Sequence, residues 1–192
     1  MPFNSPLLIN DNNLNVDLST IINGGGFIDA IITDQPYNIS KKNNFKTMGQ
    51  KGIDFGEWDK NFQQKPWLSK YISYLKPGGN IVVFCGIKQI SELVNILEEL
   101  GCDYKQLIRW EKTNPIPRNI KRLYVHDCEY CVWAVKKGKW TFNTNWQDHS
   151  YLRPKLIAPI CGGKEKTIHT TQKPLSIMSE LVKTMTNEGD VV

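Results

Sequence analysis

The chain has 192 residues, 40% of them apolar, and a formal charge of +5. This length and composition predict one domain with a real hydrophobic core. No apolar run approaches the roughly 20 residues of a membrane span, so no such span is expected. The mild basic excess fits a polyanionic partner. Five cysteines without a signal peptide predict free thiols in a reducing cytoplasm.

The amino-terminal part is expected to lead into one buried strand. Residues 7–9 predict a short strand that ends at Asp11, and residues 16–22 predict a short helix. The glycines at 24–26 precede a strand instead of opening a helix, so they indicate a flexible connection and not a phosphate loop. The apolar run at residues 28–33 is typical of a buried strand.

Helices alternate with apolar strands through the middle of the chain. Apolar residues spaced by one, three and four predict helices at residues 66–75 and 87–100. Continuous apolar runs predict strands at residues 80–85 and 104–110. This alternation is typical of an α/β fold with a parallel, doubly wound sheet. The polar residues 38–60 indicate either a mobile lid or plain disorder.

The last part of the chain begins with a polar, basic connection at residues 111–125. A strand is predicted at residues 126–136, and a helix at residues 174–185 opens with a proline in its first turn. Residues 140–142 are expected to pair with the preceding strand. Residues 144–168 show no regular pattern.

Cys128 and Cys131 have the spacing of a zinc-binding pair, but a zinc site needs further ligands. The only cysteine or histidine residues that follow them in the chain are His149, Cys161 and His169. An offset of three also places the two sulfur atoms on opposite faces of a strand. Two half-buried cysteines are therefore predicted, and no metal site.

The strand at residues 28–33 stops at Asp34-Gln35-Pro36-Tyr37. Open α/β sheets bind their ligands at the carboxyl ends of their strands. Pro36 fixes its own φ and favours an extended backbone at Gln35. The Gln35 carbonyl is then a second acceptor beside the Asp34 carboxylate, and Tyr37 offers a flat face. Two acceptors and a stacking ring suit the amino group of a planar base.

This tetrapeptide resembles the Asp-Pro-Pro-Tyr motif of amino-group DNA methyltransferases, with Gln35 in place of the first proline. Other segments are similar to motifs of the β class of that family and follow in the same order, although Thr170 is usually proline there. They cover nearly the whole chain: Asn10-Asp11, Phe55-Gly56-Glu57-Trp58-Asp59, Leu75-Lys76-Pro77-Gly78-Gly79, the run from Arg109 to Asn119, His126-Asp127-Cys128-Glu129-Tyr130 and His169-Thr170-Thr171-Gln172-Lys173-Pro174.

The resemblance implies a Rossmann-like, doubly wound, mostly parallel sheet in a circularly permuted order, with the catalytic half first. It implies methyl transfer from S-adenosylmethionine to a flipped-out base, without a metal. Asp34 goes mostly with adenine N6 in the family, and cytosine N4 is the alternative. An RNA or protein-glutamine methyltransferase is a weaker alternative. The residues expected at the reacting amine are Asp34, Gln35, Pro36 and Tyr37.

The resemblance also suggests residues for the cofactor and for DNA. Asp11 matches the position that contacts the adenosine end of the cofactor, and a helix cap is the plainer interpretation of this residue. The segment that covers the methionine end matches Thr171, Gln172 and Lys173, with Asp34 beside it. Double-stranded DNA is the expected partner, and its contacts are expected from the basic middle of the chain, at Lys112, Asn114, Arg118, Asn119, Lys121 and Arg122.

One methyltransferase domain is expected over residues 1–192. Its parts are a catalytic part at 1–140, a variable target-recognition segment at 143–168 and a cofactor-covering segment at 169–190. Family members continue past this point with a Gly-rich cofactor loop, so the fold is expected to be truncated here. The chain is then part of a longer enzyme, an inactive DNA-binding remnant, or one of two polypeptides; we favour the first.

The expected setting is the cytoplasm, and the protein is expected to be encoded by a bacterium or a phage. A cognate restriction endonuclease and a second copy of the chain are candidate partners. Gln35→Pro is expected to be tolerated, because only the backbone carbonyl of Gln35 is expected to bind the target amine.

Overall fold

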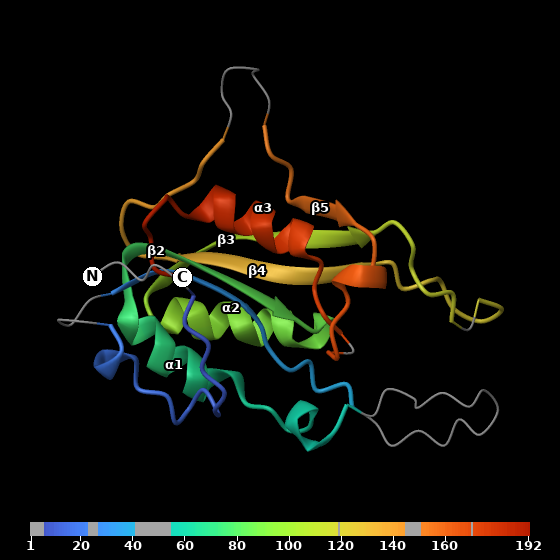
Figure 1. Cartoon of the computed structure of the whole chain (residues 1–192), viewed down its shortest axis with the longest axis horizontal. Helices are drawn as coiled ribbons and strands as arrows, with labels where there is room; N and C mark the ends of the chain where they lie inside the picture. Colours follow the sequence, from blue (N-terminus) through green and yellow to red (C-terminus); the bar gives the residue numbers. More distant parts are fainter. Residues whose placement is uncertain (1–5, 23–26, 41–54, 119, 145–150, 170) are drawn as a thin grey trace.

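The structure is a computed structural model that describes residues 6–22, 27–40, 55–118, 120–144, 151–169 and 171–192. Its strands form one sheet in the order β1-β2-β4-β3-β5 (Figure 1). β1 is parallel to β2 and β3 is parallel to β5, whereas β4 is antiparallel to both β2 and β3. Four of the five strands therefore run in one direction. The strands are β1 (Ile28–Asp34), β2 (Leu75–Cys85), β3 (Cys102–Lys112), β4 (Cys128–Lys136) and β5 (Lys155–Ala158).

Helices cover both faces of the sheet, as Figure 1 shows. α1 (Gln64–Tyr74) and α2 (Ile90–Glu99) lie on one face, and α3 (Leu175–Met185) lies on the other. Alternate residues of β2 point to opposite faces, so Val83 packs with α1 and α2 while Phe84 packs with α3. Burial on both faces explains the continuous apolar run of this strand. The predicted α/β fold with a mostly parallel sheet is confirmed.

The amino-terminal predictions are corrected in two places. Residues 7–9 are exposed and form no strand, so the strand predicted there is wrong. The helix predicted at residues 16–22 is reduced to a single 3-10 turn, Leu18–Thr20, capped by the Asp17 carboxylate, which accepts the Ser19 N–H at 2.9 Å. The three glycines at 24–26 and most of the predicted lid, residues 41–54, lie outside the described residues.

Two further differences lie in the second half. Residues 140–142 do not pair with β4, because both of its edges are occupied by β2 and β3. Phe142 instead stacks on Trp133, with ring centroids 5.2 Å apart. The sequence does not predict β5, since its four residues bury only Leu156 and Ala158, which is too short a pattern to recognise.

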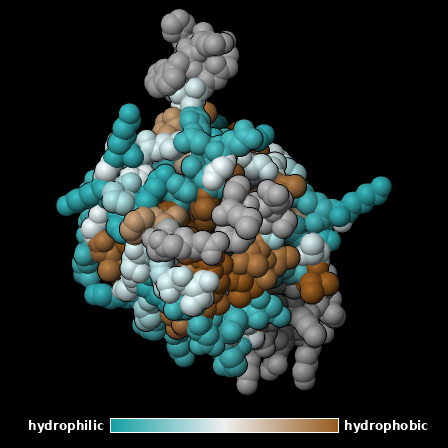
Figure 2. Space-filling view, turned by 60° about the vertical axis from the view of Figure 1, so that its left-hand side comes forward, coloured by the Kyte–Doolittle hydropathy of each residue, from teal (hydrophilic) through white to brown (hydrophobic). Residues whose placement is uncertain are grey.

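The last residues of the chain lie beside β1. Asp29 N–H donates to the Val191 carbonyl at 2.8 Å, and Val191 N–H donates to the Asp29 carboxylate at 2.7 Å, so the end of the chain lies along β1. Exposed apolar residues in this part include Phe27 and Val192. Figure 2, which brings the left-hand side of Figure 1 forward, shows apolar side chains gathered on that side.

The antiparallel direction of β4 determines where the polar residues meet. Because β4 runs against its neighbours, its first residues lie at the edge where β1 and β2 end. Phe84 pairs with Asp34 on one side and with Cys131 on the other, which brings Glu129 close to the end of β1. The edge predicted to bind a ligand therefore receives side chains from both strand directions.

Candidate active site

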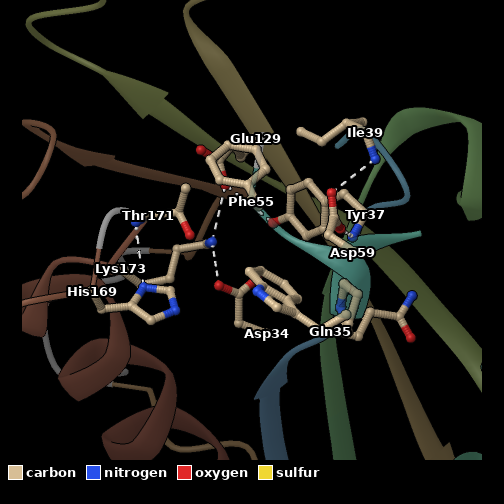
Figure 3. A pocket seen from close by; sticks show the side chains of 12 residues that line it. Asp34, Gln35, Tyr37, Ile39, Phe55, Asp59, Glu129, His169, Thr171 and Lys173 are labelled. Atoms are coloured by element: carbon tan, nitrogen blue, oxygen red, sulfur yellow. Dashed lines mark hydrogen bonds and ion pairs between the residues drawn. The ribbon is translucent and has the colours of Figure 1, made fainter. Parts of the chain in front are cut away.

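Three charged side chains from distant parts of the chain meet beyond the end of β1. The Lys173 ammonium lies 2.6 Å from Asp34 Oδ2 and 3.1 Å from Glu129 Oε2 (Figure 3). Asp34 is the last residue of β1, Glu129 is the second of β4, and Lys173 stands just before α3. The Lys173 side chain is only 7% exposed, so this ion pair is largely shielded from water.

Glu129 has two more partners. Tyr37 donates its hydroxyl to Glu129 Oε2 at 3.1 Å, and Lys112 forms an ion pair with Glu129 Oε1 at 2.9 Å. The Lys173 ammonium also lies over the rings of Tyr37 and Phe84, at 5.2 Å and 5.3 Å from their centroids. Two carboxylates and two rings thus surround one ammonium group.

The two carboxylates respond differently to this setting. Burial raises the pKa of Asp34 above its ordinary value, and the nearby Lys173 ammonium only partly offsets that effect. Burial also acts to raise the pKa of Glu129, but the Lys173 and Lys112 ammonium groups outweigh it and hold that pKa below its ordinary value. Burial and the charges of Asp34 and Glu129 raise the pKa of Tyr37, so its phenol stays protonated and donates.

Asp59 holds the segment that follows the tetrapeptide. Its buried carboxylate accepts four consecutive backbone N–H groups: those of Tyr37 and Asn38 on Oδ1, at 2.7 Å and 2.9 Å, and those of Ile39 and Ser40 on Oδ2, at 3.0 Å and 2.7 Å. The segment can turn this way because Asn38 adopts a φ of 56°, a conformation that asparagine tolerates better than most residues. This arrangement fixes the backbone that carries the Tyr37 ring.

The Gln35 side chain points away from the three charged groups (Figure 3). It is 5% exposed, donates to Gln64 Oε1 at 2.6 Å and accepts from Trp67 Nε1 at 3.2 Å. The next carbonyl, that of Pro36, accepts from Gln89 Nε2 at 3.0 Å. Buried amides therefore anchor this backbone from behind.

The cavity at this edge has a volume of about 130 Å³. Aromatic rings and acids line it, a combination suited to a flat base with an amino group. Trp58 remains 53% exposed, so one wall of the cavity is open to solvent. The lining residues are Asp34, Gln35, Pro36, Tyr37, Ile39, Phe55, Trp58, Asp59, Glu129, His169, Thr171 and Lys173.

Most of the residues predicted for catalysis and cofactor binding meet in this cavity, but two do not. Gln172 uses its side chain locally: it accepts from Thr167 N–H at 2.8 Å and donates to the Glu165 carbonyl at 3.0 Å. Asp11 is exposed and accepts from Asn12 N–H at 2.6 Å within a turn, and the helical turn that follows is capped by Asp17 instead. Neither side chain lines the cavity.

The residues predicted to contact DNA fall into two groups. Lys112 is only 12% exposed and its ammonium is paired with Glu129, and Asn114 Oδ1 accepts from Ile160 N–H at 2.6 Å, so both have partners within the fold. Arg118, Lys121 and Arg122 are exposed on the loop between β3 and β4. Asn119 lies outside the described residues.

Sequence reasoning predicts that the segment from Phe55 to Asp59 anchors the far end of the polar loop, but it assigns no role in the site to Glu129, to Asp59 or to the rings of Phe55 and Trp58. All four lie in segments that resemble family motifs, so the recurrence of those segments is the signal that could have found them. Which carboxylate faces the cavity and which binds backbone depends on contacts between distant segments.

Comparison with known proteins agrees with this geometry. Residues 28–192 match the sequence profile of a family described as DNA methylase. The chain belongs to this DNA methylase family. The predicted resemblance to amino-group methyltransferases is thereby confirmed, and the predicted cofactor S-adenosylmethionine is that of the family.

Individual relatives support the same assignment. The chain is 29% identical over 185 residues to the type II methyltransferase M2.MboI of Moraxella bovis, covering 86% of this chain and 66% of that protein. It is also 29% identical to M2.LlaDCHI of Lactococcus lactis subsp. cremoris, with 68% of that protein covered. The chain thus spans about two thirds of the length of these curated relatives.

A solved structure shares the fold. The crystal structure of the M1.HpyAVI-SAM complex superposes with a TM-score of 0.68 at 38% identity, covering 90% of this chain and 74% of that one. No helix in the described ranges is long and apolar enough to cross a membrane.

Proposed function

We propose that this protein transfers a methyl group from S-adenosylmethionine to the N6 amino group of adenine in double-stranded DNA. The observation that carries the proposal is the Asp34 carboxylate at the end of β1, facing a cavity lined by the rings of Tyr37, Phe55 and Trp58. Membership of the DNA methylase family supplies the reaction class.

The chain's own groups would make the amine reactive. The lone pair of an exocyclic amine is delocalised into the base, so the amine is a poor nucleophile. Hydrogen bonds from its two N–H groups to the Asp34 carboxylate and the Gln35 carbonyl favour a more tetrahedral nitrogen with a freer lone pair. Tyr37 stacks on the base and holds that lone pair in line with the methyl group. Because the cavity admits no base pair, the target nucleotide must leave the duplex.

The residues at this edge fit the proposed cofactor. The bound cofactor supplies a methyl group on a positively charged sulfur, and the acids and rings beside Lys173 are the groups that suit a cation. Thr171 and Lys173 would hold its methionine end from the segment before α3. Asp11 lies outside this cavity, and the turn it caps is the only role its contacts support.

Cytosine N4 is the alternative target, since the same pair of acceptors suits either amine, and Asp34 favours adenine. RNA and protein glutamine are the other acceptors to be tested. An inactive DNA-binding remnant would keep the basic loop of Arg118, Lys121 and Arg122 without methyl transfer. Duplex phosphates are the proposed contacts of this loop, which also contains Asn119.

The biological setting is part of the proposal. The relatives carry type II methyltransferase names and come from bacteria, which supports a role in bacterial cytoplasm beside a cognate restriction endonuclease. A homodimer is the other assembly to be examined, by light scattering of the purified protein.

The test is methylation of duplex DNA, RNA and protein by the purified protein with radiolabelled cofactor, followed by identification of the modified base. N6-methyladenine in DNA is the expected product. If N4-methylcytosine is found instead, cytosine N4 is the target and adenine is rejected. Label in RNA or protein alone would reject DNA as the substrate.

A further inference from the structure

Glu129 has no assigned role, yet it is the centre of the polar network. Its two oxygens bind three groups: the Tyr37 hydroxyl and the Lys173 ammonium on Oε2, and the Lys112 ammonium on Oε1. Asp34 and Glu129 share Lys173 (Figure 3). Through the ion pair of Glu129 with Lys112, the network continues from Asp34 to Lys112. It contains two acids and two ammonium groups.

The ion pair with Lys173 conflicts with the proposed work of Asp34. One of the two carboxylate oxygens open to a target amine, Asp34 Oδ2, already accepts the Lys173 ammonium at 2.6 Å. A charge-assisted hydrogen bond is about twice as strong as a neutral one, so a neutral amine displaces the ammonium only if that ammonium has another acceptor. An unpaired ammonium in so shielded a place would be costly.

Glu129 is that other acceptor. Its Oε2 lies 3.1 Å from Lys173 Nζ, and the rings of Tyr37 and Phe84 flank the ammonium on the way. Lys173 can therefore leave Asp34 by a small rotation, without entering water or giving up its charged partner. Lys112 holds Glu129 in place from the opposite side.

We propose that Glu129 is a positioning residue that takes the Lys173 ammonium from Asp34 when the target amine enters, while it holds the Tyr37 ring through its hydroxyl. This inference rests on the proposed function. It assigns to Glu129 a role that acts through Lys173 and requires its negative charge.

The simpler alternative is that Glu129 only supports the fold by binding Tyr37 and Lys112. Glu129→Gln separates the two roles, because glutamine can still accept the Tyr37 hydroxyl but carries no charge. Lys173→Met removes the ammonium that has to be moved. Together with the double variant they form a cycle in which coupling between the two residues is measured directly.

The first experiment measures kcat and the KM for DNA in the wild type, Glu129→Gln, Lys173→Met and the double variant. Glu129→Gln should lower kcat between about 5- and 100-fold, the range expected for coupled neighbours, with a smaller change in KM. In the Lys173→Met background the same substitution should change kcat less than about twofold. An equal reduction in both backgrounds would overturn the proposal.

The second experiment needs no activity. The carboxyl carbon of Asp34 is titrated by NMR in the same variants. Glu129→Gln should lower the pKa of Asp34, because it removes a nearby negative charge and leaves Lys173 with Asp34 alone; Lys173→Met should raise it. An Asp34 titration that Glu129→Gln leaves unchanged would rule out the shared ammonium.

Lys112→Met serves if Glu129→Gln fails to fold. Without Lys112, Glu129 attracts Lys173 more strongly, so the pKa of Asp34 should rise, and a fall or no change would count against the proposal.

The kinetic and titration experiments also separate the role of Glu129 from the proposed function. A wild type that methylates nothing defeats the proposed function while the titrations still test the network; an active wild type with additive kinetics defeats only the role of Glu129.

Discussion

The Asp34 carboxylate and the Lys173 ammonium are 139 positions apart in the sequence and 2.6 Å apart in space. The contact joins the end of β1 to the residue that precedes the proline at the start of α3. It places the acid proposed to bind the target amine in direct contact with the segment proposed to cover the cofactor. Substitutions at Asp34 should therefore affect the segment that contains Lys173, and substitutions at Lys173 should affect Asp34.

Asp34→Ala should lower kcat by at least about 100-fold, the usual effect of removing a preorganised hydrogen-bonding group from a reacting centre. Lys173 keeps Glu129 as a partner, so the free energy of unfolding at neutral pH should change by less than about 1 kcal/mol. Methylation assays and urea unfolding measure the two quantities. A variant that is inactive because it is unfolded would not support the assigned role, whereas a folded, active variant would refute it.

The pH dependence of methylation should report the raised pKa of Asp34. Amine binding needs the ionised carboxylate, so kcat should fall as pH decreases through a pKa above the ordinary value of 3.8. The groups that act on Asp34 are Lys173, Glu129 and Tyr37. The acid limb should move to higher pH in Lys173→Met and to lower pH in Glu129→Gln. Identical limbs in all three proteins would show that another group controls the profile.

The raised pKa of Asp34 also makes the stability of the folded protein depend on pH. The folded protein holds the Asp34 proton more tightly than the unfolded chain, so the stabilisation is present below the unfolded pKa of 3.8 and is lost as pH rises through the folded value. Glu129 has the opposite effect. Its lowered pKa stabilises the folded protein at pH values above the ordinary pKa of 4.5, and this stabilisation is lost as pH falls through the pKa of the folded state.

Asp59→Ala should destabilise the protein by about 2–4 kcal/mol and reduce methylation, because four backbone N–H groups are deprived of one buried acceptor. Urea unfolding measures the first effect. The effect on kcat follows because the Tyr37 backbone is no longer held.

Glu57→Gln is a matched control for Asp59→Ala. Glu57 belongs to the same 3-10 helix, Glu57–Asp59, but its side chain is 86% exposed. Its substitution should change the free energy of unfolding by less than about 0.5 kcal/mol. Equal destabilisation in the two variants would mean that the helix, and not the Asp59 carboxylate, holds the segment.

The sequence predicts the core of this fold well because burial on both faces leaves an unmistakable apolar pattern. The central strands and the three α-helices follow from that pattern, although β2 begins at Leu75 and not at residue 80 as predicted. It cannot show that β4 lies between β2 and β3, since pairing partners depend on distant segments. It also misses β5, whose two buried residues leave almost no pattern.

The candidate site is predictable from the sequence only in part, for the same reason. Asp34 and Tyr37 stand out because polar residues abruptly end an apolar strand. Neither Glu129 nor Asp59 has such a local sequence signal. The role of Glu129 depends on its ion pair with Lys173, and that of Asp59 depends on hydrogen bonds from a stretch of backbone N–H groups. The sequence predicts that Gln35 acts only through its carbonyl, whereas its side chain is buried in a network of amides.

That burial changes the prediction for Gln35→Pro. Proline leaves Gln64 and Trp67 without their partner and removes the Gln35 N–H, which donates to the Phe84 carbonyl at 3.4 Å. The expected destabilisation is about 2–4 kcal/mol, with kcat of the folded fraction retained because the carbonyl remains. Adding Gln64→Leu should recover part of the stability, since it removes the Gln64 oxygen that has lost its donor, whereas the Trp67 indole N–H still lacks its acceptor. A Gln35→Pro protein as stable as the wild type would support the tolerance that the sequence alone predicts.

The basic loop between β3 and β4 gives the prediction for DNA. Alanine at Arg118, Lys121 and Arg122 should weaken binding to duplexes of any sequence, because phosphate contacts carry affinity without base specificity. The slope of log K against log salt should become less steep by about 0.9 for each phosphate that is no longer neutralised, up to about 3 in the triple variant. Lys65→Ala is the control, because its ammonium is paired with Glu99 in the α1–α2 layer. A triple variant with an unchanged salt slope would place the DNA on another surface.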